Sequence, residues 1–130
     1  MIKKTKLILL ISCLIIFMVV VCIMLFENKA TVSKEFNVSD YQYYIDNFSS
    51  NEILGTIVDS EDVIKKAETT WIKVYGKSVK SQRPYQVFYD ENNKVWLIRG
   101  SFKSNKRKGG VANIIIQNDS GKVLAIWHDE

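Results

Sequence analysis

Residues 60–76, SEDVIKKAETTWIKVYG, carry the clearest amphipathic pattern after the apolar N-terminal run, and we expect the fold to be organised around them. On a helix of 100° per residue, the apolar side chains fall within about 120° of one another and the lysines lie opposite. Asp59 or Ser60 can accept a hydrogen bond from the first turn, and Gly76 suits the helix end. The stretch therefore predicts a helix whose buried face carries Val63, Ile64, Ala67, Trp71, Val74 and Tyr75.

After Gly76 the apolar period changes from 3.6 to 2, which indicates strands. Residues 85–90, 95–102, 111–117 and 122–128 are rich in β-branched and aromatic side chains. Short polar turns at 90–94 and 118–121 favour antiparallel pairing, since such turns join adjacent strands. The predicted fold class is α+β, with one or two helices packed on one side of a curved four-stranded antiparallel sheet.

A second, shorter helix is expected after Ser39 or Asp40, which can cap it. Its apolar side chains recur at helical spacing and are expected to belong to the core: Tyr41, Tyr44, Ile45 and Phe48. Residues 27–38 are polar and lack a convincing period, so they are interpreted as a spacer. The outward-facing domain is then expected to cover residues 39–130.

The N-terminus carries an uncharged apolar run of 20 residues that begins at Leu7 and ends at Phe26. As a helix it would span about 30 Å, the thickness of bilayer hydrocarbon, so it predicts a single transmembrane anchor. The lysines in residues 1–6 favour a cytoplasmic N-terminus and an external domain. An alternative is a bacterial lipoprotein with its lipid on Cys13, because Leu10, Ile11 and Ser12 before it resemble a cleavage site. An ordinary signal peptide fits less well.

Charge and cysteine content narrow the class of function. The formal net charge is +4, and without the three N-terminal lysines 15 basic residues face 14 acidic ones, so a nucleic-acid role loses its support. The balance is uneven, with four basic and nine acidic residues in 27–70 against eleven and five in 71–130. Both cysteines lie in the apolar run, which leaves the domain without a thiolate metal site. We expect no cofactor, metal or catalytic residues.

The order of several short motifs resembles a known family. They are Gly55-x-Ile57-x-Asp59, Ala67-Glu68, Tyr75-Gly76, Arg83-Pro84-Tyr85, Val95-Trp96-x-Ile98-x-Gly100, Gly109-Gly110, Gly121-Lys122-Val123-Leu124 and His128. Over about residues 55–128 the chain resembles the bacterial nuclear transport factor 2-like immunity proteins of polymorphic toxin systems. The resemblance implies a cone-shaped domain that binds and neutralises a cognate protein toxin without catalysis. A scaffold of an envelope secretion machine, and a small-ligand or enzyme domain using the cone cavity, are the alternatives.

Three sets of residues are candidates for a functional site. Lys103, Lys106, Arg107 and Lys108 form the densest charge cluster, interpreted either as a solvated hairpin tip or as a contact for an acidic toxin surface or anionic lipid headgroups. Trp127 is a candidate partner anchor if exposed; a covering first helix or a dimer mate is the alternative. Tyr85 and His128, with Tyr89, are candidates for the mouth of the cone.

Overall fold

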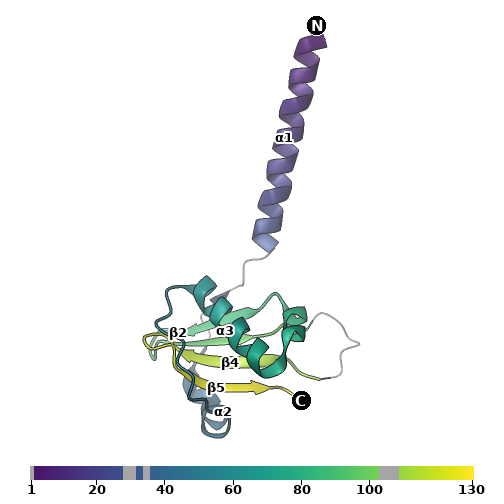
Figure 1. Ribbon diagram of the computed structural model, residues 1–130. Helices are drawn as coiled ribbons and strands as arrows, with labels where there is room; N and C mark the ends of the chain where they lie inside the picture. The colour runs from purple at the N-terminus through teal and green to yellow at the C-terminus, as the bar shows by residue number, and fades with distance from the viewer. Residues whose placement is uncertain (1, 28–31, 34–35, 103–108) are drawn as a thin grey trace.

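The computed structural model describes residues 2–27, 32–33, 36–102 and 109–130. Helix α3 (Ser60–Tyr75) crosses one face of a five-stranded sheet of order β1-β2-β3-β4-β5 (Figure 1). The strands are β1 (Val32–Ser33), β2 (Gln86–Asp90), β3 (Val95–Arg99), β4 (Ala112–Gln117) and β5 (Val123–His128). The remaining helices are α1 (Ile2–Glu27), α2 (Gln42–Asn47) and the 3-10 helices η1 (Val38–Tyr41) and η2 (Lys77–Gln82).

Helix α3 has the ends that its sequence predicts, and its buried face matches the prediction except at Val74, which is 55% exposed. Asp59 caps it, because its Oδ1 accepts a hydrogen bond from the Asp62 N–H at 2.8 Å, and Gly76 leaves it at φ 83°. The side chains of Val63, Ala67 and Trp71 are fully buried against the sheet. The sheet contributes apolar side chains from four strands to this first core: Val87, Ile98, Ala112, Ile114, Ile116 and Val123.

The four predicted strands are confirmed as the antiparallel part of the sheet, β2 to β5. The strand predicted for residues 95–102 is β3, and it ends earlier than predicted, at Arg99 rather than Phe102. The chain turns there because the Ser101 N–H donates to the Gln82 carbonyl at 2.8 Å, which joins it to η2 instead of the sheet. Phe102 consequently lies outside the core and is 55% exposed.

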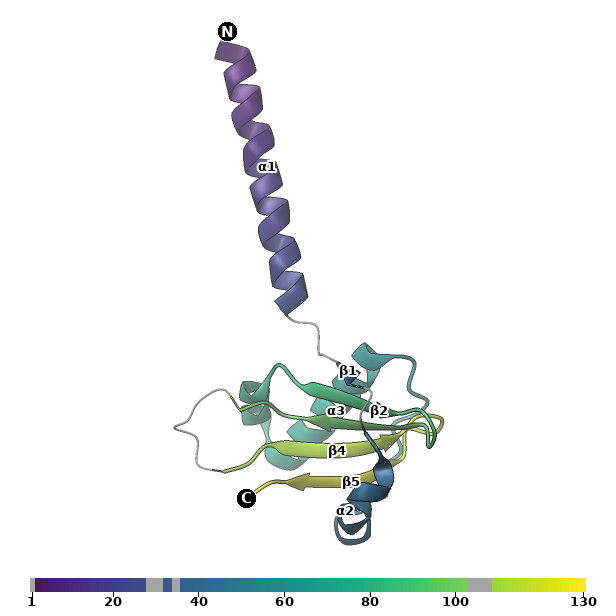
Figure 2. The ribbon, with the colours of Figure 1, turned by 180° about the vertical axis from the view of Figure 1, so that it is seen from behind.

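A second core lies on the sheet face opposite α3, where η1 and α2 pack (Figure 2). The prediction of a helix near residues 40–48 is confirmed, but the helix is split into two short pieces and lies on the other side of the sheet from α3. Phe48, which was expected in the core, is 42% exposed. Asn37, not Ser39 or Asp40, caps the first piece. The reason for the second layer is that β3 and β4 are apolar on both faces, so Leu97 and Ile115 need a cover of their own.

Strand β1 is a feature that the sequence did not predict, since it lies in the stretch interpreted as a spacer. It pairs parallel to β2, with Val32 opposite Val87 and Ser33 opposite Phe88. Two residues are too few to show an apolar period, so the sequence alone does not predict this strand. It forms because the edge of β2 offers free backbone hydrogen-bonding groups. The segment after α1 is thereby joined to the sheet edge.

Helix α1 contains the one stretch among the described residues, Ile2–Met24, that is long and apolar enough to cross a membrane. A signal sequence near an N-terminus has the same length and composition. The side chains of this stretch are exposed and take no part in either core.

Asp90 fastens the second layer to the sheet and makes the domain sensitive to acid. Its buried carboxylate accepts hydrogen bonds from the Val38 N–H at 2.9 Å and from Asn93, and these contacts, led by that of Val38, lower its pKa. A carboxylate with a lowered pKa contributes stability above its unfolded pKa of about 3.8 that is lost as the pH falls through the folded value.

We therefore expect Asp90→Asn to cost about 2 kcal/mol at pH 7, the scale of a hydrogen bond to a charged group, and less at pH 3. Urea unfolding of the full chain in mild detergent at both pH values measures this difference. An equal cost at pH 3 and pH 7 would contradict the assigned role of the charge.

Candidate functional site

Tyr85 lies inside the first core, not at an open mouth. It is 4% exposed, its ring packs edge-on against Trp71 at 5.0 Å between centroids, and its hydroxyl donates to Glu68 Oε2 at 2.6 Å. Burial, followed by the hydrogen bond to Glu68, raises its pKa. Its hydroxyl therefore stays protonated near neutral pH and has a structural role.

His128 is exposed at the end of β5, where its ring packs edge-on against Tyr75 at 5.6 Å. Strands β3 and β4 lie between β5 and the strand that follows Tyr85. Tyr89 is elsewhere again, with its ring 4.4 Å from that of Trp96. The structure does not bring Tyr85, Tyr89 and His128 together, so the predicted shared cavity mouth does not fit this arrangement.

Glu68 and Arg83 form an ion pair at the edge of α3 that the sequence analysis did not single out. Arg83 donates to both carboxylate oxygens of Glu68, with Nε at 2.7 Å from Oε2, and this contact lowers the pKa of Glu68. Tyr85 completes the group. The carboxylate is fully engaged, so the group holds α3 to the start of β2 rather than offering a free base.

Trp127 is covered, so the interpretation as a partner anchor, which required an exposed ring, does not apply. It is 5% exposed, its ring stacks on Tyr44 at 4.2 Å between centroids, and Tyr41 lies 6.2 Å away. The alternative interpretation, a covering first helix, is the arrangement that the structure shows. Trp127 is therefore a member of the second core and is not available to a partner.

The basic cluster of Lys103, Lys106, Arg107 and Lys108 lies outside the described residues. The described residues just before and just after this cluster line a hollow of about 290 Å³. The hollow lies at the end of the sheet, on the face that α2 covers only in part. The hollow is lined by Gln86, Arg99, Gly100, Ser101, Phe102, Val111 and Asp129.

A polar network forms the floor of this hollow. Arg99 donates from Nε to Asn113 Oδ1 at 2.7 Å and pairs with Asp129 Oδ2 at 3.1 Å. Asn113, which is fully buried, and Trp127 Nε1 both donate to Asp129 Oδ1. This network was not predicted, although the lone asparagine within the apolar strand ANIIIQ was a signal for it in the sequence.

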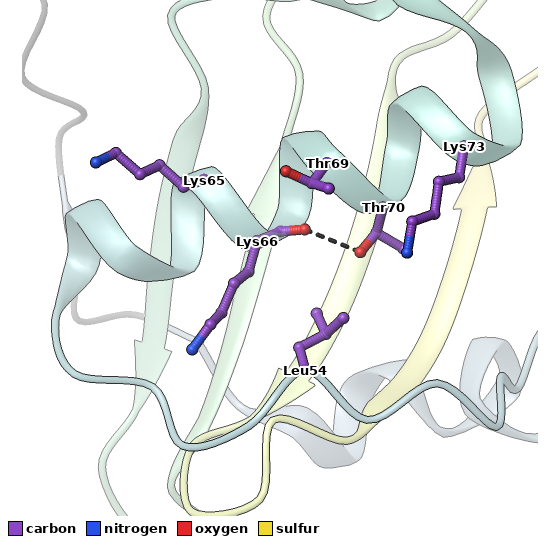
Figure 3. A pocket seen from close by; sticks show the side chains of 6 residues that line it. All are labelled: Leu54, Lys65, Lys66, Thr69, Thr70 and Lys73. Atoms are coloured by element: carbon purple, nitrogen blue, oxygen red, sulfur yellow. Dashed lines mark hydrogen bonds between the residues drawn. The ribbon is translucent and has the colours of Figure 1, made fainter.

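A second, smaller hollow of about 170 Å³ separates α3 from the segment that leads into it (Figure 3). Leu54 points from that segment toward the helix, between Lys66 and Lys73. Lys66 Nζ lies 3.0 Å from Asp62 Oδ2 and Lys73 Nζ lies 2.9 Å from Glu52 Oε1. The Val58 N–H, followed by Lys66, lowers the pKa of Asp62. These lysines hold the segment in place and do not form an open anion site.

The described side chains offer no group of three or more histidine, cysteine, aspartate or glutamate residues that could hold a metal ion.

Comparison with known proteins assigns the chain to a family. A protein-family model described as NTF2 fold immunity protein matches residues 63–130, which is just over half of the chain and takes in β2 to β5 with nearly all of α3. Neither a curated protein nor a solved structure matches the chain. The match agrees with the helix-on-sheet architecture and with the order of motifs in the sequence. The chain belongs to the NTF2 fold immunity protein family.

Proposed function

We propose that this protein binds a cognate bacterial toxin of a polymorphic toxin system and neutralises it by protein–protein contact. The observation that carries the proposal is the family match over residues 63–130, the part of the chain that builds β2 to β5 and most of α3. An immunity protein acts by blocking a toxin, and a rigid domain with two well-packed cores is suited to presenting a fixed surface.

The side chains described above support contact rather than catalysis. Hydrogen bonds within the fold lower the pKa of three carboxylates, those of Glu68, Asp62 and Asp90. These groups therefore stay charged at neutral pH. A general acid or base needs a pKa near the working pH and reach to a substrate. These three groups instead stabilise the fold.

We also propose that α1 anchors the protein in the cytoplasmic membrane, with residues 1–6 inside and the domain outside. Its length and apolar composition support a span, and the lysines before it support this orientation. Lipidation at Cys13 is the competing arrangement. Partner contact by the basic cluster stays a prediction from the sequence; its residues are Lys103, Lys106, Arg107 and Lys108.

Co-expression tests the toxin proposal. Cells that produce the toxin encoded beside this protein should be rescued by the full chain, and the two proteins should purify as one complex in mild detergent. A variant lacking residues 63–130 is the control, because it shows whether rescue comes only from reduced expression of the toxin. Absence of both rescue and complex formation would refute the proposal.

Cysteine labelling tests the topology. In a Cys13→Ala, Cys22→Ala background, a membrane-impermeant maleimide should label Ser49→Cys in intact cells and Lys4→Cys only after lysis. Labelling of Lys4→Cys in intact cells would overturn the orientation. The intact mass of the wild-type chain, measured separately, distinguishes an uncleaved anchor from a cleaved and lipidated Cys13.

A further inference from the structure

One continuous stretch of the domain surface has an unusual composition. Residues 36–64 contain six acidic residues and no lysine or arginine. Among the described residues after 35, six large apolar side chains are exposed, and four of them belong to this stretch. These four are Tyr43 at 66%, Phe48 at 42%, Ile53 at 68% and Val58 at 82% exposure. We refer to the exposed side chains of residues 36–64 as the acidic–apolar surface.

The exposed aromatic rings of this surface are held firmly from below. Tyr43 packs edge-on against Tyr44 at 5.4 Å and lies 6.5 Å from the ring of Phe48. Tyr44 in turn stacks on the buried Trp127. Exposed aromatic side chains fixed in this way lose little conformational entropy on binding, and Tyr and Trp are enriched among the residues that dominate protein interfaces.

The backbone of the surface is equally fixed. The chain leaving α2 runs along the outer edge of β5, where the Ile126 N–H donates to the Phe48 carbonyl at 3.0 Å and the Val123 N–H donates to the Glu52 carbonyl at 2.9 Å. The Leu54 N–H donates to the Gly121 carbonyl at 2.9 Å. The exposed apolar side chains of this chain therefore sit on a rigid edge of the sheet.

The charges beside the rings identify the kind of partner. Asp40 and Asp46 are exposed and form no ion pair with any residue that the structure describes, and Asp46 accepts only a neutral hydrogen bond, from Gln42 at 2.8 Å. A negative rim around an aromatic centre complements a protein face with lysines or arginines around an apolar recess. A second copy of this chain that met it through the same surface would complement it less well, because residues 36–64 carry no lysine or arginine.

The position of the surface in the sheet favours access from outside. β1 follows α1 after only residues 28–31, a connection of at most about 18 Å, so a membrane-spanning α1 keeps the β1 edge near the bilayer. Helix α2 and residues 48–52, which carry Tyr43 and Phe48, lie against β5, at the opposite edge (Figure 2). At about 4.8 Å per strand, these edges are about 19 Å apart.

We propose that the acidic–apolar surface is the contact surface for a positively charged face of the cognate toxin, with Tyr43 and Phe48 at its centre. This inference rests on the proposed function. It differs from the sequence-based expectation that the basic cluster at 103–108 meets an acidic toxin surface, so the two surfaces predict toxins of opposite local charge.

The test measures affinity of the full chain in mild detergent for an inactivated form of the toxin encoded beside it. Tyr43→Ser and Phe48→Ser should each weaken binding by about thirtyfold, the scale of a hot-spot residue. Asp40→Lys with Asp46→Lys should weaken binding by about tenfold and reduce its dependence on salt. Val74→Ser and Phe102→Ser are matched controls, since both residues are 55% exposed and lie outside the surface.

The outcomes separate the two proposals. If the wild type does not bind, the proposed function fails. If the wild type binds and Tyr43→Ser binds equally well, this inference is wrong, and Lys106→Glu with Arg107→Glu shows whether the basic cluster is the contact instead. Because Tyr43 is mostly exposed, its variant should keep the wild-type unfolding midpoint, so loss of binding is not loss of folding. A toxin-free dimer that Tyr43→Ser dissociates would also overturn the inference.

Discussion

Replacing Trp71 by alanine is expected to lower the free energy of unfolding by about 3 to 5 kcal/mol, the cost of removing a buried aromatic side chain from a packed core. Trp71 is fully buried between α3 and the sheet, and its ring packs on Tyr85. Its Nε1 also donates to the Asn113 carbonyl at 3.4 Å. Because the two cores share the strands of one sheet, the loss should weaken the whole domain. Urea unfolding of the full chain measures it.

Two variants show whether the loss comes from the cavity. Trp71→Phe keeps most of the apolar volume and should cost clearly less than the alanine variant. Val74→Ala removes an apolar side chain from the same helix, but one that is 55% exposed, and should change stability by less than about 0.5 kcal/mol. A similar cost for all three variants would contradict the assignment of Trp71 to the centre of the core.

Gly121→Ala is expected to be the second large effect, with a loss of more than about 3 kcal/mol. Gly121 has φ +68°, and a Cβ there would lie 1.9 Å from the Gly55 carbonyl oxygen. That contact is with backbone, which cannot rotate away as a side chain can. The variant must therefore push the lead-in segment off the β4–β5 turn and break the hydrogen bond from Leu54 to Gly121.

Gly76→Ala is the matched control for this prediction. Gly76 has a similar φ of +83°, but a Cβ there would meet nothing within 4 Å. It should therefore cost only backbone strain, about 1 to 3 kcal/mol, because its φ of 83° and ψ of 177° lie in a region that alanine rarely adopts. Equal losses for the two variants would mean that backbone conformation, and not the close approach to Gly55, governs position 121.

The two glycines also illustrate what a sequence can and cannot reveal. Gly76 follows an amphipathic helix, so its role as a helix end could be predicted from residues 60–76 alone. The close contact of Gly121 with Gly55 joins positions far apart in the chain, and no local pattern predicts it. The same holds for Asp90, whose turn was predicted but whose hydrogen bond to the Val38 N–H was not.

The candidate site divides in the same way. The aromatic spacing of Tyr41, Tyr44 and Ile45 predicted a packed helix, and these side chains do join the second core. Tyr43 and Phe48 come from the same short stretch, yet the fold leaves both rings exposed beside acidic residues. Burial of Trp127 depends on where α2 lies. The alternation along β5 alone did not decide between an exposed and a covered ring.

The sequence by itself determined the elements of this protein: the amphipathic helix, the four antiparallel strands, the apolar N-terminal run and the family to which the order of motifs belongs. These depend on local periodicity, capping and turn chemistry, which are written in neighbouring residues. Only the tertiary structure decided that α2 covers the sheet face opposite α3, that β1 joins the edge of β2, and that Tyr43 and Phe48 stay in solvent. Those outcomes depend on which faces meet, and both faces of β3 and β4 were apolar enough to accept a cover.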